Sequence, residues 1–128
     1  MKRPELLLID DEPALADFVA NAARECGFEP AITSDDARFR EQFRLSRPAV
    51  VAMDLGMPVD GVELLRFLAD EDFEGPVLII SGFDRRVLES AFRLGTAQGL
   101  NMVGPLEKPV RLEELENLLR GLKPAVPS

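Results

Sequence analysis

Two short apolar runs in this sequence end directly in carboxylates. Leu6–Ile9 is followed by Asp10 and Asp11, and Ala49–Met53 is followed by Asp54. Apolar runs of this length predict buried strands of a parallel sheet, whose carboxyl ends meet at one edge. Because ligands of open α/β sheets bind at that edge, we expect the three carboxylates to converge on a functional site.

Two further polar side chains follow later predicted strands. Ser81 comes after Val77–Ile80, and Lys108 comes after a strand expected at about 100–103. A hydroxyl and an ammonium beside carboxylates suit phosphoryl transfer, because they can hydrogen-bond and neutralise phosphoryl oxygens as charge spreads over them. Asp54 is the expected nucleophile, which would form an acyl phosphate.

Three converging carboxylates need a cation, because like charges at short range raise at least one pKa. Mg²⁺ prefers oxygen ligands and keeps positions for water and a phosphoryl oxygen, so the sequence predicts magnesium at Asp10, Asp11 and Asp54. Each residue also has an ordinary structural interpretation. Asp11 suits a helix N-cap, Ser81 a turn and Lys108 a solvated charge. Their joint order along the chain favours the chemical interpretation.

The rest of the chain must position these groups, and it alternates short apolar runs with helical stripes. This pattern predicts five βα units and an α/β fold. The expected strands are Leu6–Ile9, Pro30–Thr33, Ala49 to Asp54, Val77–Ile80 and about Leu100–Val103. The expected helices run from Asp11 to Gly27, from Ser34 as N-cap to Arg44, from Asp60 onward, from near Asp84 to Gly99, and after Pro109. The fourth helix should turn Val87, Leu88, Ala91 and Leu94 inward.

Length and charge narrow the classes of function. A chain of 128 residues predicts one compact domain. The net charge of -8 opposes binding to nucleic acid and to anionic membranes. The run Arg38, Arg40, Arg44 and Arg47 is interrupted by acids, as on a solvated helix face. The absence of histidine excludes histidine acid–base chemistry, histidine zinc sites and phosphohistidine carried by the chain itself.

The sequence also predicts a cytoplasmic location. Cys26, the single cysteine, lies on an apolar helical stripe and is expected in the core, which suits a reducing compartment. No apolar stretch approaches the ~20 residues of a membrane span, and no secretory pattern is present. Residues 123–128 contain two prolines and predict a C-terminal tail or the start of a linker.

Three segments resemble motifs of the receiver domain of bacterial two-component response regulators. They are Leu7–Pro13, the phosphoacceptor segment Asp54–Pro58 with Asp60–Gly61, and Glu107–Pro109. The resemblance extends from about Pro4 to Leu122, so we expect a receiver domain at residues 1–122. It implies a doubly wound, flavodoxin-like (βα)5 fold with strand order 2-1-3-4-5.

The resemblance also implies a mechanism and partners. Magnesium is expected at Asp11, Asp54 and the Gly56 carbonyl, with Asp10 helping through water. A sensor histidine kinase or phosphotransfer protein would supply the phosphoryl group. The domain would be a signalling switch rather than an enzyme, catalysing only its own phosphorylation and dephosphorylation. An appended or separate output domain and a homodimer both remain open.

The sequence departs from the family pattern in three places. The loop Met57–Gly61 is one residue shorter than usual. The stretch Gly95–Lys108 is longer, which should lengthen the fourth helix or its exit loop. Pro105 stands where an aromatic switch residue is usual. We therefore expect the loop Ser81–Asp84 to transmit the phosphorylation signal instead.

The sequence also allows other interpretations. Residues 99–109 are similar to receivers that precede EAL-type cyclic-di-GMP phosphodiesterase domains, whereas a stand-alone receiver would simply end. A phosphorylation-independent interaction module would keep the fold, but it would be expected to lack one of the site residues. A hydrolase of the haloacid dehalogenase class would need an aspartate at Glu12, and a dinucleotide-binding fold would need a Gly-rich loop after the first strand.

Overall fold

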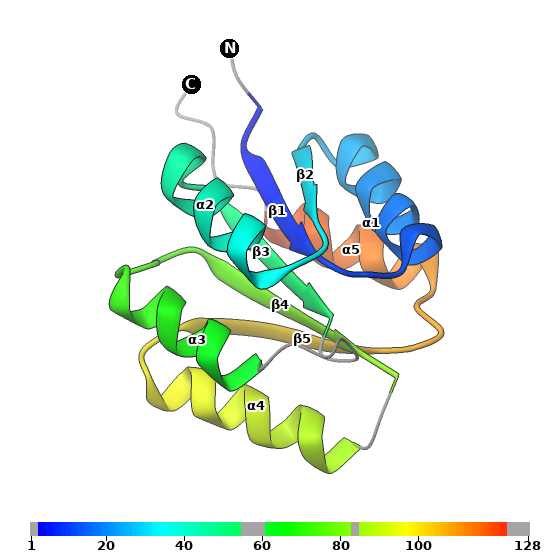
Figure 1. The fold of residues 1–128 in the computed structure, drawn as a ribbon. Helices are drawn as coiled ribbons and strands as arrows, with labels where there is room; N and C mark the ends of the chain where they lie inside the picture. Colours follow the sequence, from blue (N-terminus) through cyan, green and yellow to red (C-terminus); the bar gives the residue numbers. More distant parts are fainter. Residues whose placement is uncertain (1–2, 55–60, 83–84, 123–128) are drawn as a thin grey trace.

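The protein is described by a computed structural model of residues 3–54, 61–82 and 85–122. In these residues, parallel strands form one sheet in the order β2-β1-β3-β4-β5 (Figure 1). The strands are β1 (Glu5–Ile9), β2 (Glu29–Thr33), β3 (Val50–Asp54), β4 (Pro76–Ser81) and β5 (Asn101–Glu107). The helices are α1 (Pro13–Glu25), α2 (Asp36–Ser46), α3 (Gly61–Asp70), α4 (Arg85–Ala97) and α5 (Leu112–Leu122). The predicted fold class and strand order are confirmed.

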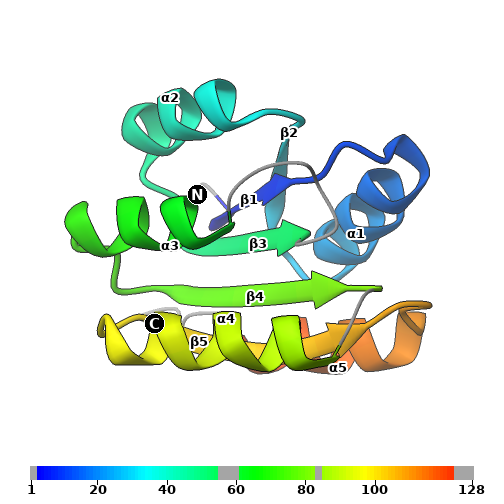
Figure 2. The same cartoon turned by 60° about the horizontal axis from the view of Figure 1, so that its bottom comes forward.

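Helices cover both faces of the sheet, because alternate strand residues point to opposite sides (Figure 2). One set packs against α2, α3 and α4, and it comprises Leu7, Ile9, Val51, Met53, Val77 and Ile79. The other set packs against α1 and α5, and it comprises Leu6, Leu8, Val50, Ala52, Leu78 and Ile80. Strands buried on both faces explain why these segments appear in the sequence as continuous apolar runs.

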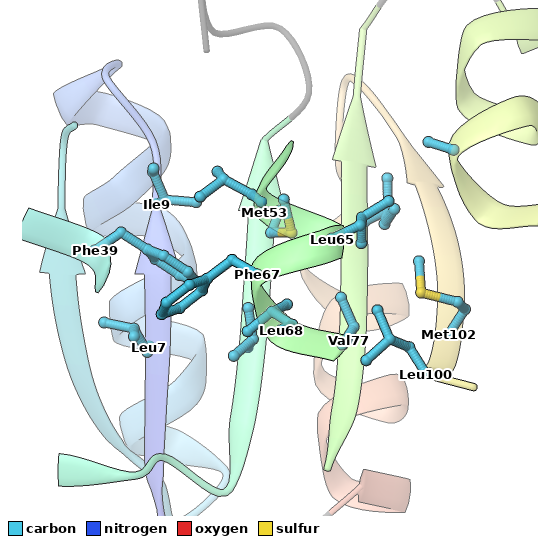
Figure 3. Close-up of a cluster of buried hydrophobic side chains, with 14 of the residues drawn as sticks. Leu7, Ile9, Phe39, Met53, Leu65, Phe67, Leu68, Val77, Leu100 and Met102 are labelled. Atoms are coloured by element: carbon cyan, nitrogen blue, oxygen red, sulfur yellow. The ribbon is translucent and has the colours of Figure 1, made fainter. Parts of the chain in front are cut away.

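Aromatic rings anchor α2 and α3 on the sheet (Figure 3). Phe39 and Phe43 of α2 are fully buried, and the ring of Phe43 meets that of Phe67 edge-on at 5.4 Å between centroids. The guanidinium groups of Arg40 and Arg44 lie 5.0 and 5.1 Å from the Phe67 centroid. The side chains of Arg38, Arg44 and Arg47 are exposed, as predicted, whereas Arg40 is half-buried. Arg40 and Arg44 also cover the Phe67 ring.

The start of α2 differs from the prediction. Asp35, not Ser34, is the N-cap, and its carboxylate accepts a hydrogen bond from the Arg38 backbone N–H at 2.8 Å. Both residue types cap helices well, so the sequence alone does not separate them. The helix also continues two residues past Arg44, to Ser46.

The inward face of α4 is also shifted from the prediction. Leu88 is buried and Ala91 is nearly so, as expected, but Val87 is 54% exposed. Phe92 packs on the core cluster from the position after Ala91. Cys26 at the end of α1 is buried, as predicted, and lies 3.6 Å from the Glu116 carbonyl oxygen of α5.

Strand β5 extends to Glu107, four residues beyond the predicted end at Val103. Val103 pairs with Leu78, while Leu106 pairs with Ile80, so β5 contains one more residue than β4 between these pairs. This bulge has Gly104 at φ +91°, a conformation that favours glycine. The bulge places one extra residue within β5, while α4 ends at Ala97.

Some predictions fall outside the described residues. They include the expected helix start at Asp60, most of the short loop Met57–Gly61, the residues Phe83 and Asp84, and the tail at 123–128. Within the described part of the chain, no helix is both long and apolar enough to span a bilayer.

Gly75, just before β4, is predicted to be required for close packing of the sheet's amino edge. A β-carbon there would lie 2.2 Å from the backbone oxygen of Ala49 and 2.7 Å from Phe73. Gly75→Ala should lower the free energy of unfolding by about 1–3 kcal/mol in urea titrations. Gly121→Ala is the matched control, since a β-carbon there meets nothing within 4 Å, and it should be neutral or stabilising. Equal stability of the two variants would contradict this packing argument.

Candidate functional site

The three predicted carboxylates converge at the carboxyl edge of the sheet. β1 and β3 are neighbours, with Ile9 paired to Met53, so Asp10 and Asp54 follow at the same level. One carboxylate oxygen each from Asp10, Asp11 and Asp54 lies within 4.8 Å of the other two. The predicted convergence of these three carboxylates is therefore confirmed.

The carboxylates of this cluster differ in burial: two form a buried floor, and one lies at an exposed rim. Asp10 is 2% exposed and Asp54 is 5% exposed, whereas Asp11 lies at the surface. Carboxylates are rarely buried unless a partner compensates their charge. The two buried carboxylates therefore need a cation, and the exposed rim leaves a path from solvent.

Lys108 reaches this cluster from the end of β5. Its Nζ lies 3.0 Å from Asp54 Oδ2, within hydrogen-bonding distance, and 3.7 Å from Glu12 Oε2. Its backbone N–H donates to the Ser81 carbonyl oxygen at 2.9 Å. Lys108 is thus tied to β4 by its backbone and to β3 by its side chain.

Ser81 is the last residue of β4 and is 1% exposed. Asp54 pairs with Ile80, so Ser81 follows one residue beyond the level of Asp54 on the neighbouring strand. The predicted group of strand-end residues is therefore complete among the described positions, and it comprises Asp10, Asp11, Asp54, Ser81 and Lys108. Gly56, the predicted carbonyl ligand, lies outside the described residues.

Asp10 has one satisfied and one unsatisfied carboxylate oxygen. Oδ1 accepts a hydrogen bond from the Glu12 backbone N–H at 2.9 Å, while Oδ2 is buried without a hydrogen-bond partner in the described structure. A buried acceptor of this kind is costly unless something satisfies it. A divalent cation held with Asp11 and Asp54 would do so, and an all-oxygen donor set suits Mg²⁺. The residues present therefore fit the predicted metal.

The pKa values of Asp10 and Lys108 are both shifted by the burial and the neighbouring charges of the site. Burial raises the pKa of Asp10 from 3.8 to about 6; the Asp54 charge adds to this rise, while the Glu12 N–H and the Lys108 charge oppose it. Burial alone would lower the pKa of Lys108, but its hydrogen bond to Asp54 and the surrounding acids outweigh burial, so that pKa is raised. The cluster therefore favours cations.

Sequence reasoning missed two contributors to the site. Glu12 supplies both the N–H bonded to Asp10 and a second carboxylate near Lys108, and it precedes α1 as its N-cap without a side-chain cap bond. This arrangement replaces the interpretation of Asp11 as the cap. Thr33, at the end of β2, accepts the Asp10 backbone N–H through its carbonyl at 3.0 Å. Backbone contacts of this kind leave no signal in residue types.

Comparison with known proteins places these residues in a recognised context. The family profile described as "Response regulator receiver domain" matches residues 6–120. The "Transcriptional regulatory protein TrcR" of Mycobacterium tuberculosis is 34% identical over 118 residues, covering 91% of this chain and 44% of that protein. A crystal structure of a response regulator from Colwellia psychrerythraea superimposes with a TM-score of 0.82 at 26% identity, covering 95% of this chain and 98% of that one.

The curated relatives are longer than this chain. Besides the 44% covered in TrcR, the chain covers 48% of the "Probable transcriptional regulatory protein TcrX" of Mycobacterium tuberculosis, at 33% identity over 118 residues and 91% of this chain. The match therefore concerns about half of each of these two proteins.

Asp10 is predicted to destabilise the metal-free fold at neutral pH. Because its folded pKa is about 6 against 3.8 in a free side chain, ionising it costs folding energy that grows as pH rises through this window. Asp10→Asn should raise the free energy of unfolding by about 1–3 kcal/mol near pH 8 in chelator. The gain should fade toward pH 4, as Asp10 becomes protonated in both states. Urea titrations across this range, showing a pH-independent gain or a loss, would contradict the assignment.

Proposed function

This chain belongs to the response regulator receiver domain family, the signalling domain of two-component systems, and on that premise we propose that it is a switch phosphorylated on Asp54 in the presence of Mg²⁺. The observation that carries the proposal is the 3.0 Å contact between Lys108 Nζ and Asp54 Oδ2 beside the Asp10 and Asp11 carboxylates. A carboxylate phosphoacceptor needs a neighbouring cation to stabilise the negative charge that accumulates during transfer, and Lys108 lies beside Asp54.

Asp54 is the proposed nucleophile. A carboxylate oxygen forms a bond to the phosphorus of the donor while the phosphorus–nitrogen bond of a kinase phosphohistidine breaks. The electron pair of that bond stays on the departing imidazole nitrogen, which later takes a proton from solvent. A sensor histidine kinase or a phosphotransfer protein is the proposed donor, since this chain has no histidine of its own.

The proposed metal ligands are Asp10, Asp11, Asp54 and the Gly56 carbonyl, with Asp10 acting directly or through water. Bound Mg²⁺ would neutralise phosphoryl oxygens as negative charge accumulates on them. The buried, unpartnered Oδ2 of Asp10 supports this assignment, as does the short separation of the three carboxylates.

Ser81 and Lys108 are proposed to bind the transferred phosphoryl group. Ser81 would donate its hydroxyl proton in a hydrogen bond to one phosphoryl oxygen, and the Lys108 ammonium would pair with another. The same groups would serve dephosphorylation, in which water attacks phosphorus and the bond to the Asp54 oxygen breaks. Inorganic phosphate would leave, and Asp54 would return to a carboxylate.

Output is proposed to follow a route without an aromatic switch. Pro105 is exposed on β5 and has no aromatic ring that could change rotamer. The proposed moving element is the loop Ser81–Asp84, whose last two residues lie outside the described structure, together with the start of α4; its movement would shift a two-state equilibrium on phosphorylation. The curated relatives are named as transcriptional regulators, so an appended or separate output domain belongs to the same proposal. The competing function is an interaction module that ignores phosphorylation.

Asp54 is predicted to be the only phosphorylated residue. Incubation with a small phosphodonor such as acetyl phosphate and Mg²⁺ should add one phosphoryl group, measured as intact mass. Asp54→Asn should abolish the gain, because the amide is a poor nucleophile in the same volume. No gain by the unaltered protein, from either acetyl phosphate or a phosphorylated kinase, would favour the interaction module, and a peptide map placing the group elsewhere would refute the assignment.

Asp11 and Lys108 are predicted to fail in different ways. Asp11→Ala should abolish Mg²⁺ binding, measured by titration calorimetry, together with phosphorylation, because it removes a metal ligand. Lys108→Ala should leave Mg²⁺ binding nearly intact while phosphorylation no longer alters amide exchange in α4, because its charge meets the phosphoryl group. Undiminished phosphorylation of Asp11→Ala in chelator would overturn the metal assignment, and loss of Mg²⁺ binding in Lys108→Ala would overturn the division of roles.

A further inference from the structure

Gly82 lies directly under the side chain of Lys108. It follows Ser81 at the exit of β4 and is exposed. A β-carbon on Gly82 would lie 3.1 Å from Lys108 Cδ and 3.2 Å from Lys108 Cβ. Carbon atoms pack best at about 3.5–4.0 Å, so the lysine stem occupies space that any larger residue at position 82 would claim.

Backbone conformation does not explain a glycine at this position. Positive φ values among the described glycines occur at Gly27, Gly99 and Gly104, and Gly82 is not one of them. Alanine could therefore adopt the same backbone without left-handed strain. The restriction at Gly82 comes from the neighbouring side chain.

We propose that Gly82 is a positioning residue for Lys108. Because Gly82 has no side chain, the aliphatic chain of Lys108 can run across it from β5 to Asp54. The inference rests on the proposed function, in which Lys108 pairs with the phosphoryl group. It assigns to Gly82 no contact with the phosphoryl group or the metal.

The stem of Lys108 has little room to yield at its base. The Lys108 backbone N–H is bonded to the Ser81 carbonyl oxygen at 2.9 Å, which fixes the lysine Cβ against residue 82. A methyl group at position 82 must then tilt the outer carbons, and Nζ moves with them. A displaced ammonium also has a second carboxylate in Glu12, already at 3.7 Å, so it can leave Asp54 without losing all its charge compensation.

Gly82→Ala should slow phosphorylation of the full chain by acetyl phosphate by up to about 10-fold, because contacts of 3.1 and 3.2 Å require a smaller shift than the ~1 Å misplacement that can cost about 100-fold. Mg²⁺ binding should persist, because Lys108 is not a metal ligand. Gly121→Ala is the matched control and should phosphorylate at the normal rate, since its new methyl group meets nothing.

A double-mutant cycle separates action through Lys108 from other effects. In a Lys108→Ala background, Gly82→Ala should have no further effect on the rate, because the displaced side chain is already gone. Slowing that persists in that background would overturn the proposal, since Gly82 would then act on donor access or on the loop itself. An unchanged rate in the single variant, or an equal loss of Mg²⁺ affinity, would also overturn it.

A crystal structure of unphosphorylated Gly82→Ala tests the placement without any rate measurement. Lys108 Nζ should lie farther from Asp54 Oδ2 than the 3.0 Å seen in the unaltered protein, and an unmoved ammonium would refute the inference. If the unaltered protein accepts no phosphoryl group, the proposed function fails, while this structure still decides whether Gly82 positions Lys108.

Discussion

Mutual repulsion among the carboxylates at the sheet edge is the constraint on which the site depends. Asp10 and Asp54 are both nearly buried, and Asp11 joins them at the rim. Such a group persists only with cationic compensation, and in the described structure Lys108 contributes it through Asp54. The hydrogen bond from the Lys108 backbone N–H to the Ser81 carbonyl oxygen holds the ends of β4 and β5 at the same level. The position of the Lys108 charge beside Asp54 therefore depends on how these two strands pair.

The parts of the fold that sequence could predict are those set by side-chain polarity over several residues. Continuous apolar runs located the strands, since strands covered on both faces have no polar side to reveal their period. The carboxylates after two of these runs then predicted the cluster. The order of the strands was different, because no periodicity specifies it and only the family resemblance supplied it.

The errors arose where local preferences were balanced or where tertiary contacts decided. Ser34 and Asp35 are both good caps, and a shift of one residue separates the two choices. Val87 lies one position before Leu88, and the packing of Phe92 against the core fixed the helix rotation that leaves Val87 exposed. Glu12 contributes to the site mainly through its backbone N–H, which every non-proline residue possesses. The residue type at position 12 therefore could not predict this contact.

The bulge in β5 lets this strand contain an extra residue while its buried side chains keep facing the same helices. In an unbroken strand, one inserted residue turns every later side chain to the opposite face. Here Val103 and Leu106 both face α1 and α5 although three positions separate them, and Lys108 still arrives beside Ser81. The bulge absorbs one extra residue and restores the orientation of the side chains that follow it. The one additional residue in β5 therefore leaves Lys108 in register with Ser81 at the edge of the sheet that carries the site.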